Sequence, residues 1–172
     1  MFLSGGDFVK KIGLCIVILS MLLSACAAVP TFETLEGVEL NEAPVKKRMA
    51  VTLPEEASVQ TVNGENGRIY FCDGYEILLE TMSSGDLNRT LLSLTGFGKD
   101  SLTLIQTKRN GNDCYECAWT SAGEGGDQVG RTAVIDHGGY HYCLSMTAPS
   151  DSASAIQTVW QDVLDSLQLL ES

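Results

Sequence analysis

Alternating apolar and polar residues predict that most of the chain from residue 47 to residue 147 forms short β-strands. The runs 68–72 (RIYFC) and 75–80 (YEILLE) flank Asp73-Gly74, and Asp-Gly between two such runs is a strong signal for a tight hairpin turn. Further strands are expected, in chain order, at 47–53, 101–108, 113–120, 128–136 and 140–147. Glycine-rich turns separate the last three strands, which predicts an antiparallel meander.

Two segments show the helical period of apolar residues instead. The first covers about 86–95; it follows the cap residues Ser83-Ser84-Gly85-Asp86 and ends at Gly96. The second runs from Ala153 to about Leu167 and follows the cap residues Ser150-Asp151-Ser152. Its apolar positions form one stripe, made of Ile156, Val159, Trp160, Val163, Leu164 and Leu167. This stripe is expected to pack on a sheet face, with Trp160 as a core residue.

Strands outnumber helices in this pattern, and most of the strands are antiparallel by local connection. The sequence therefore predicts an α+β fold, in which an antiparallel sheet of about six or seven strands packs against helices. The length of this part of the chain suits one domain, which we place at residues 47–172.

The N-terminal segment has the parts of a secretory signal peptide. Lys10 and Lys11 precede an apolar run at 12–23, which is shorter than the roughly 20 residues of a membrane-spanning helix. Leu23-Ser24-Ala25-Cys26 then resembles the lipobox of bacterial lipoproteins. In that family acyl chains such as palmitate are attached at the cysteine, and cleavage before it makes it the first residue. The resemblance implies a signal peptide at 1–25, with a lipidated N-terminus and tether at 26–46.

A lipidated Cys26 would hold the domain at the cell membrane, facing outside the cytoplasm. An ordinary signal peptide with an incidental cysteine is the alternative. Cleavage would remove Asp7, Lys10 and Lys11, which takes the chain from 11 basic and 22 acidic residues to 9 and 21, a net charge of −12. An acidic domain is not expected to bind nucleic acid, because phosphate binding needs a basic face. The net charge also argues against docking of the domain surface on anionic lipid.

The order of the elements also resembles a known fold. A last strand (YHYCLSMTAP), a capped amphipathic helix and a short apolar tail at 167–170 are similar to the corresponding parts of bacterial lipoproteins of unknown role, whose domain is PsbP-like (Mog-type). The resemblance covers about 47–170 and implies an α/β/α sandwich. It also implies a binding or assembly role without catalytic residues, since members of that family are mostly of this kind. A function inferred from fold alone is an analogy.

Four cysteines remain after Cys15 is removed and Cys26 is lipidated: Cys72, Cys114, Cys117 and Cys143. They are candidates for a disulfide or for buried thiols. Cys114 and Cys117 have the C-x-x-C spacing of redox sites, yet in a straight strand they point to opposite faces and lie roughly 10 Å apart, too far for a bridge. Cys117 and Cys143 are expected on either side of the strand 128–136. The partner of Cys72 is left open.

Two histidines flank the expected turn near residue 138. His137 is expected in the turn and His141 on the strand surface, and their spacing matches no familiar metal site. We expect no catalytic site, metal or cofactor. The sequence therefore predicts a membrane-anchored, non-catalytic binding or assembly protein, whose partner is an unknown envelope protein or a small ligand. The alternative is an envelope thiol–disulfide oxidoreductase that uses the C-x-x-C pair.

Overall fold

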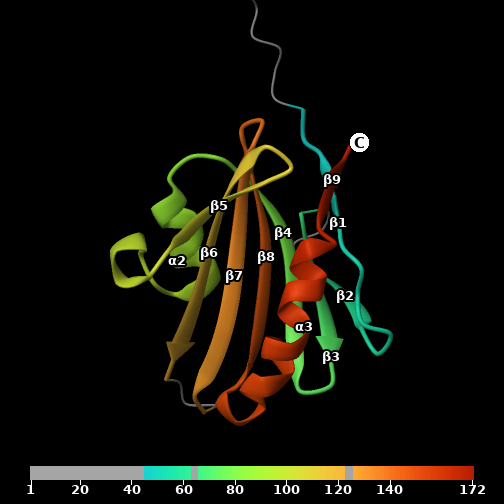
Figure 1. Ribbon diagram of the computed structural model, residues 1–172, viewed down its shortest axis with the longest axis vertical. Coiled ribbons are helices and arrows are strands. Elements are labelled where there is room, and N and C mark those ends of the chain that lie inside the picture. Colours follow the sequence, from blue (N-terminus) through green and yellow to red (C-terminus); the bar gives the residue numbers. More distant parts are fainter. Residues whose placement is uncertain (1–44, 63–65, 123–125) are drawn as a thin grey trace, which may run out of the picture. The chain divides into compact units, whose positions relative to one another are not determined.

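The structure is a computed structural model that describes residues 45–172 except 63–65 and 123–125 (Figure 1). The predicted signal peptide, the lipobox and most of the tether lie outside the described residues, so these remain predictions. Glu42–Ser172 forms one compact unit with its own hydrophobic cores, and this segment can therefore be studied alone.

A seven-stranded antiparallel sheet forms the centre of the domain, in the order β2-β3-β4-β8-β7-β6-β5 (Figure 1). Its strands are β2 Ser58–Val62, β3 Gly67–Cys72, β4 Tyr75–Ser83, β5 Ile105–Arg109, β6 Asn112–Ser121, β7 Gln128–His137 and β8 Tyr140–Pro149. The predicted hairpin at Asp73-Gly74 is present, and Gly74 takes the positive φ of 82° that favours glycine in tight turns. The predicted meander β6-β7-β8 is also present. The predicted α+β fold class is therefore confirmed.

Two helices lie on the sheet, at the positions that the hydrophobic periodicity predicts. The helix α2 spans Leu87–Thr95, and α3 spans Ala153–Asp165. Asp86 caps α2 because its side chain accepts a hydrogen bond of 2.9 Å from the backbone N–H of Asn88. Gly96 ends α2 in the left-handed conformation, with φ 78°. One-turn 3₁₀ helices precede β5 and α3, at Lys99–Ser101 and Ser150–Ser152.

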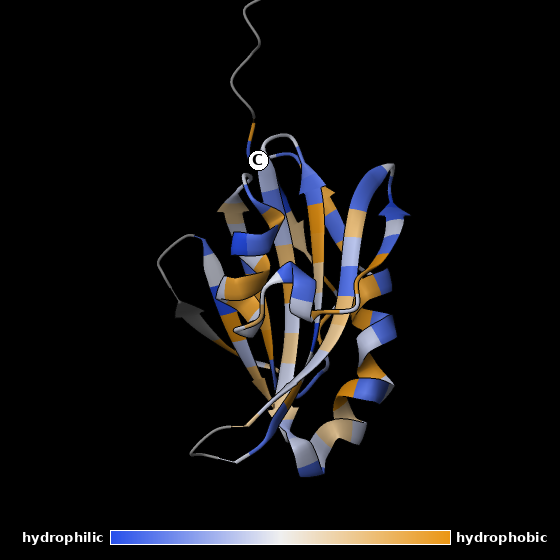
Figure 2. Cartoon of the chain, turned by 90° about the vertical axis from the view of Figure 1, so that its left-hand side faces the viewer, coloured by the Kyte–Doolittle hydropathy of each residue, from blue (hydrophilic) through white to orange (hydrophobic). Residues whose placement is uncertain are grey.

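Each face of the sheet has its own hydrophobic cluster. On one face the α3 stripe packs on β4, β7 and β8, and Trp160 is 3% exposed, which confirms it as a core residue. On the other face α2 covers a smaller cluster of Leu91, Cys117, Val134 and Cys143. Figure 2 shows apolar and polar residues alternating along the strands and along α3, as expected for elements with one buried side.

Three strand predictions differ from the structure. The segment 47–53 forms only β1, Arg48–Ala50, which pairs with β9, Gln168–Leu170, in a separate two-stranded sheet. The segment 101–108 becomes a strand only from Ile105, because Leu102 and Leu104 pack against the cluster under α2. The edge strand β2 is not predicted, since its sequence SVQTV carries few apolar residues.

Within the described residues, none of the helices has the length and the apolar composition required to cross a membrane.

Candidate functional site

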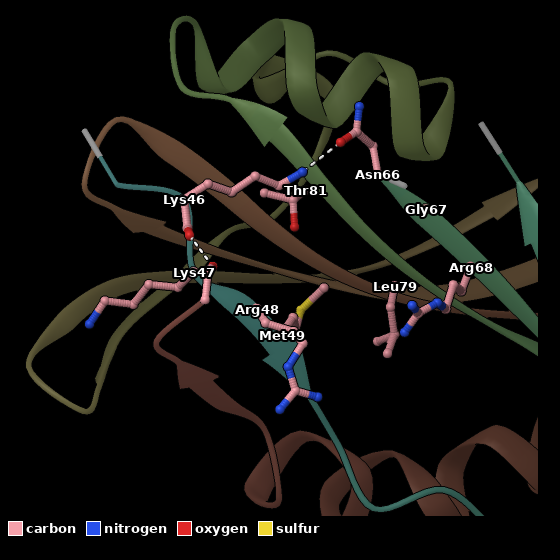
Figure 3. Close-up of a pocket in the computed structure, with 10 residues that line it drawn as sticks. Lys46, Lys47, Arg48, Met49, Asn66, Gly67, Arg68, Leu79 and Thr81 are labelled. Carbon is pink, nitrogen blue, oxygen red and sulfur yellow. Dashed lines mark hydrogen bonds between the residues drawn. The ribbon is translucent and has the colours of Figure 1, made fainter. Parts of the chain in front are cut away.

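A basic pocket of about 270 Å³ lies between β1 and the paired strands β3 and β4 (Figure 3). Its cationic residues are Lys46, Lys47, Arg48 and Arg68, and the rest of its lining is Met49, Asn66, Gly67, Leu79, Thr81 and Ser172. Figure 3 shows Lys46, Arg48 and Arg68 arranged around the apolar side chains of Met49 and Leu79. The pocket therefore has an apolar floor and a cationic rim.

The β1 side of the pocket is fixed by contacts far apart in the sequence. Arg48 pairs with Leu170 in the small sheet. The backbone N–H of Lys47 donates a hydrogen bond of 2.7 Å to the hydroxyl of Tyr142, a fully buried residue of β8. The Lys47 ammonium lies 2.9 Å from a carboxylate oxygen of Glu171. These contacts fix the position of the Lys46-Lys47-Arg48 run against the domain.

The two sides of the pocket are bridged at one end. The Lys46 ammonium donates a hydrogen bond of 2.5 Å to Oδ1 of Asn66, drawn as a dashed line in Figure 3. The carbonyl oxygen of Asn66 accepts a hydrogen bond of 2.8 Å from the backbone N–H of Thr81. The hydroxyl of Ser172 donates to the carbonyl oxygen of Lys46. Asn66 thus connects the residue pair before β1 to the main sheet at this end of the pocket.

Arg48 and Arg68 are exposed at the pocket. Among the residues that the structure describes, no carboxylate lies within ion-pair distance of either guanidinium. Arg109 differs, since it lies 2.9 Å from Asp165 and 3.6 Å from Glu116. A guanidinium carries planar donors that match two oxygens of a carboxylate or phosphate. The two arginines are therefore available for an anionic ligand.

The local charge of the pocket is opposite to that of the chain. The whole chain has a formal net charge of −11, and nine of its 11 Lys and Arg residues follow Cys26. Four of those nine line this one pocket, and one of the four, Lys47, is paired with Glu171. Concentrating cations at one site makes the local potential positive in an acidic protein and attracts small anions to it. The net charge alone does not reveal this site.

The four cysteines do not come together. Cys114 belongs to the cluster under α3 and Cys117 to the cluster under α2, so their side chains lie on opposite faces of β6. Cys117 and Cys143 are on β6 and β8, with β7 between them. Cys72 lies at the end of β3, opposite Tyr75. All four are free thiols in the structure.

The environment of these thiols opposes reactivity. Burial raises the pKa of Cys117 to about 11. Burial, followed by the charge of Glu116, raises the pKa of Cys114 above its ordinary value, and burial also raises those of Cys143 and Cys72. Redox cysteines need the opposite, a lowered pKa that populates the thiolate. The C-x-x-C pair thus lacks both the shared face and the acidity of a redox site.

The histidines also have structural surroundings. Nδ1 of His137 lies 2.7 Å from Oδ1 of Asn112, next to the β7–β8 turn. The prediction that His141 lies on the strand surface is wrong: it is 2% exposed, and its Nδ1 lies 2.7 Å from Oγ1 of Thr90. The reason is that α2 covers this end of β8. In the described part of the chain, no group of three or more His, Cys, Asp or Glu side chains is placed to hold a metal ion.

The Thr90–His141 pair predicts a pH-dependent stability. Burial lowers the pKa of His141 below its ordinary value, although the charge of Asp136 opposes this. As the pH falls through about 6.5, the unfolded chain therefore takes up a proton before the folded one does. Neutral His141 therefore makes its full contribution to the free energy of unfolding above that pH. This contribution is lost as the pH falls towards the pKa of His141 in the folded state. Urea unfolding measures this effect. Between pH 7.5 and 5.5 the free energy of unfolding should fall less for His141→Gln than for the wild type, and the difference should be largest at pH 5.5.

The matched control is His137→Gln, since His137 is only half-buried and contacts Asn112. His141 and its contact with Thr90 are retained in this variant, so the loss of stability that depends on His141 should remain. Equal slopes for the wild type and His141→Gln would contradict the assignment.

The residues of the basic pocket are the ones that sequence reasoning missed. The run Lys46-Lys47-Arg48 is visible in the sequence as the densest basic segment after Cys26. Arg68 and Asn66 are separated from it by about one strand and a turn. The spacing of the two segments in the sequence does not indicate that they are close. Their proximity depends on the pairing of β1 with β9 in a separate small sheet.

The comparisons with known proteins support the fold. No protein-family model matches the chain, and no curated protein matches its sequence. A crystal structure of a protein from Bacteroides thetaiotaomicron is similar, with a TM-score of 0.51 and 15% identity over 75% of this chain. The match covers 50% of that protein's chain, so this chain spans about half of its length.

Two smaller proteins are similar over most of their own length. LpqN, described as involved in cell envelope biogenesis of Mycobacterium tuberculosis, has a TM-score of 0.51 and 9% identity; the match covers 76% of this chain and 87% of LpqN. Cyanobacterial PsbP (CyanoP) from Synechocystis has a TM-score of 0.50 and 9% identity, covering 76% of this chain and 95% of its own. At such identities the likeness shows the fold alone, and the fold is PsbP-like, as the resemblance implies.

Proposed function

We propose that this chain is a lipid-anchored extracytoplasmic protein that binds a compact anionic ligand in its basic pocket and catalyses no reaction. The observation that carries the proposal is the gathering of four of the nine cations that follow Cys26 around one pocket. Guanidinium and ammonium groups form charge-assisted hydrogen bonds with phosphate and carboxylate oxygens. Thr81 and Asn66 add neutral polar groups that can orient the ligand.

The size of the pocket supports a small ligand over a protein partner. Ligand pockets usually measure roughly 300–1,000 Å³, and this one, at about 270 Å³, suits a ligand with one or two phosphate or carboxylate groups. A protein partner would need a much larger contact area. Among the described lining residues, none has a histidine, cysteine, aspartate or glutamate side chain, and these side chains often act as acid, base or nucleophile. This supports binding without catalysis.

The lipid anchor in this proposal rests on Leu23-Ser24-Ala25-Cys26. The fold similarity to LpqN, which is described as involved in cell envelope biogenesis, supports an envelope location. A lipidated Cys26 would keep the domain close to the membrane, since only about 20 residues separate it from Lys47. The domain would therefore bind its ligand at the outer side of the membrane.

The proposal is tested by calorimetric titration of residues 42–172 with inorganic pyrophosphate at low ionic strength. The variant Arg48→Gln/Arg68→Gln should bind about 10- to 100-fold more weakly, since each substitution removes a charge-assisted hydrogen bond. Binding to the wild type should also weaken with added salt, because the pocket is open to solvent.

The matched control is Arg89→Gln/Lys99→Gln, which removes the same two charges from exposed positions near α2. It should bind pyrophosphate as the wild type does. If both double variants lose affinity equally, the net charge of the domain governs binding and the pocket does not.

A further inference from the structure

A second concave region, which we call the α3 groove, runs along one side of α3. It consists of two adjoining cavities of about 400 and 260 Å³, and both are lined by Ala118 and Arg131. One wall is formed by Ala153, Ile156, Gln157 and Trp160 of α3. The groove exists because α3 packs mainly on β7 and β8, which leaves β5 and β6 without a helix on this face of the sheet (Figure 1).

The floor and the outer rim of the α3 groove combine small or apolar side chains with polar ones, and the lining includes the carboxylate of Glu116. Ala118 of β6 is exposed, and it lies opposite Arg131 of β7 in the strand register. Ile105 of the edge strand β5 is 61% exposed and lines the outer side. An apolar side chain of this size exposed beside a concave surface is typical of a binding region.

Arg131 lies at the junction of the two cavities and is half-buried. Among the described residues, no carboxylate lies within ion-pair distance of its guanidinium. The nearby carboxylate of Glu116 lies 3.6 Å from Arg109, which is also bound to Asp165. A partly desolvated cation between apolar walls favours a ligand that brings one negative charge together with an apolar body.

The face of β6 in the groove offers few backbone hydrogen-bonding groups to a peptide, because these groups lie in the plane of the sheet. The strand β6 pairs with β7 along most of its length and with β5 at residues 112–116, so only its segment 117–121 has one side without a strand partner. A peptide lying across this face would bury its own N–H and C=O groups without partners, which is costly. An alkyl chain has no such groups and can lie along Ile105 and Trp160.

We propose that the α3 groove binds a linear amphipathic carboxylate, with the carboxylate on Arg131 and the alkyl chain along the apolar walls. Each methylene buried in the groove should raise the affinity about three- to fourfold. The affinity should stop rising once the chain is longer than the groove. This site is separate from the basic pocket and does not depend on the function proposed for it.

The probe for the test is sodium dodecanoate below its micelle concentration, titrated into residues 42–172. The protein has two tryptophans, and both line the groove; in Trp119→Phe the emission comes from Trp160 alone. Saturable binding should shift this emission, and Arg131→Gln should weaken binding at least tenfold. Calorimetry on the wild type gives a second readout that needs no tryptophan substitution.

Three controls make the result specific. Arg89→Gln removes an exposed charge on α2 and should bind dodecanoate normally. Dodecyltrimethylammonium, which has the same chain and the opposite charge, should not bind. Ala118→Phe fills the groove from an exposed position and should abolish binding while the domain stays folded.

Wild-type affinity in Arg131→Gln or in Ala118→Phe would overturn the proposal, and so would equal binding of the cationic amphiphile. The variant Arg48→Gln/Arg68→Gln should still bind dodecanoate normally. Loss of binding in that variant would place the amphiphile in the basic pocket and also overturn the proposal.

Discussion

Replacing Gly130 by alanine is expected to destabilise the domain by about 2–4 kcal/mol. A Cβ atom at this position of β7 would lie 2.2 Å from Cζ2 of the Trp119 indole, far closer than a real contact allows. Trp119 lies directly opposite Gly130 in the register, and its Nε1 donates a hydrogen bond of 3.0 Å to Oγ1 of Thr132. Moving the ring would break this bond and disturb the Thr132–Ser145 contact below it. Urea unfolding measures the loss.

Two further variants make this result specific to the ring. Gly85→Ala is the control, since a Cβ at Gly85 meets no atom within 4 Å, and its stability should change by less than about 0.5 kcal/mol. In a Trp119→Ala background, Gly130→Ala should cost much less than in the wild type, because the obstructing ring is absent. An unchanged cost in that background would show that the backbone, and not the indole, requires glycine.

Replacing Cys26 by alanine is expected to abolish lipidation completely. The predicted lipobox attaches the acyl chains through the sulfur of this residue, and cleavage follows the attachment. In bacterial cells given labelled palmitate, the wild type should carry the label and begin at residue 26. Cys26→Ala should carry no label and should keep residues 1–25, which mass spectrometry detects directly.

The matched control is Cys15→Ala, because Cys15 lies inside the apolar run of the predicted signal peptide. This variant should be labelled and cleaved like the wild type. A labelled Cys26→Ala protein would contradict the anchor, as would a wild type cleaved at a site other than the bond before Cys26.

The fold could be predicted where local patterns decide it. The apolar stripe from Ile156 to Leu167 correctly predicted the position and the buried face of α3. Asp73-Gly74 correctly predicted the β3–β4 hairpin. The two-stranded sheet of β1 and β9 could not be predicted, because it joins Arg48 to Leu170 across nearly the whole domain. The predicted strand at 101–108 is wrong for its first four residues. The alternation at Leu102 and Leu104 reflects packing under α2 and not strand pairing.

The candidate site was less accessible to prediction than the fold. The opposite faces of Cys114 and Cys117 follow from the strand period alone and are confirmed. The burial of His141 depends on where α2 lies over the sheet, and neighbouring residues give no sign of it. The basic pocket depends on a contact between residues 46–48 and 66–68, and the average charge of the chain conceals it.

The most direct test of the anion-binding claim is a heteronuclear NMR titration of residues 42–172 with pyrophosphate. We expect the backbone amide shifts to concentrate at 46–49, 66–68 and 79–81, the segments that line the basic pocket. Absence of shifts at these segments, or shifts concentrated along α3 and β6 instead, would show that the basic pocket does not bind the anion.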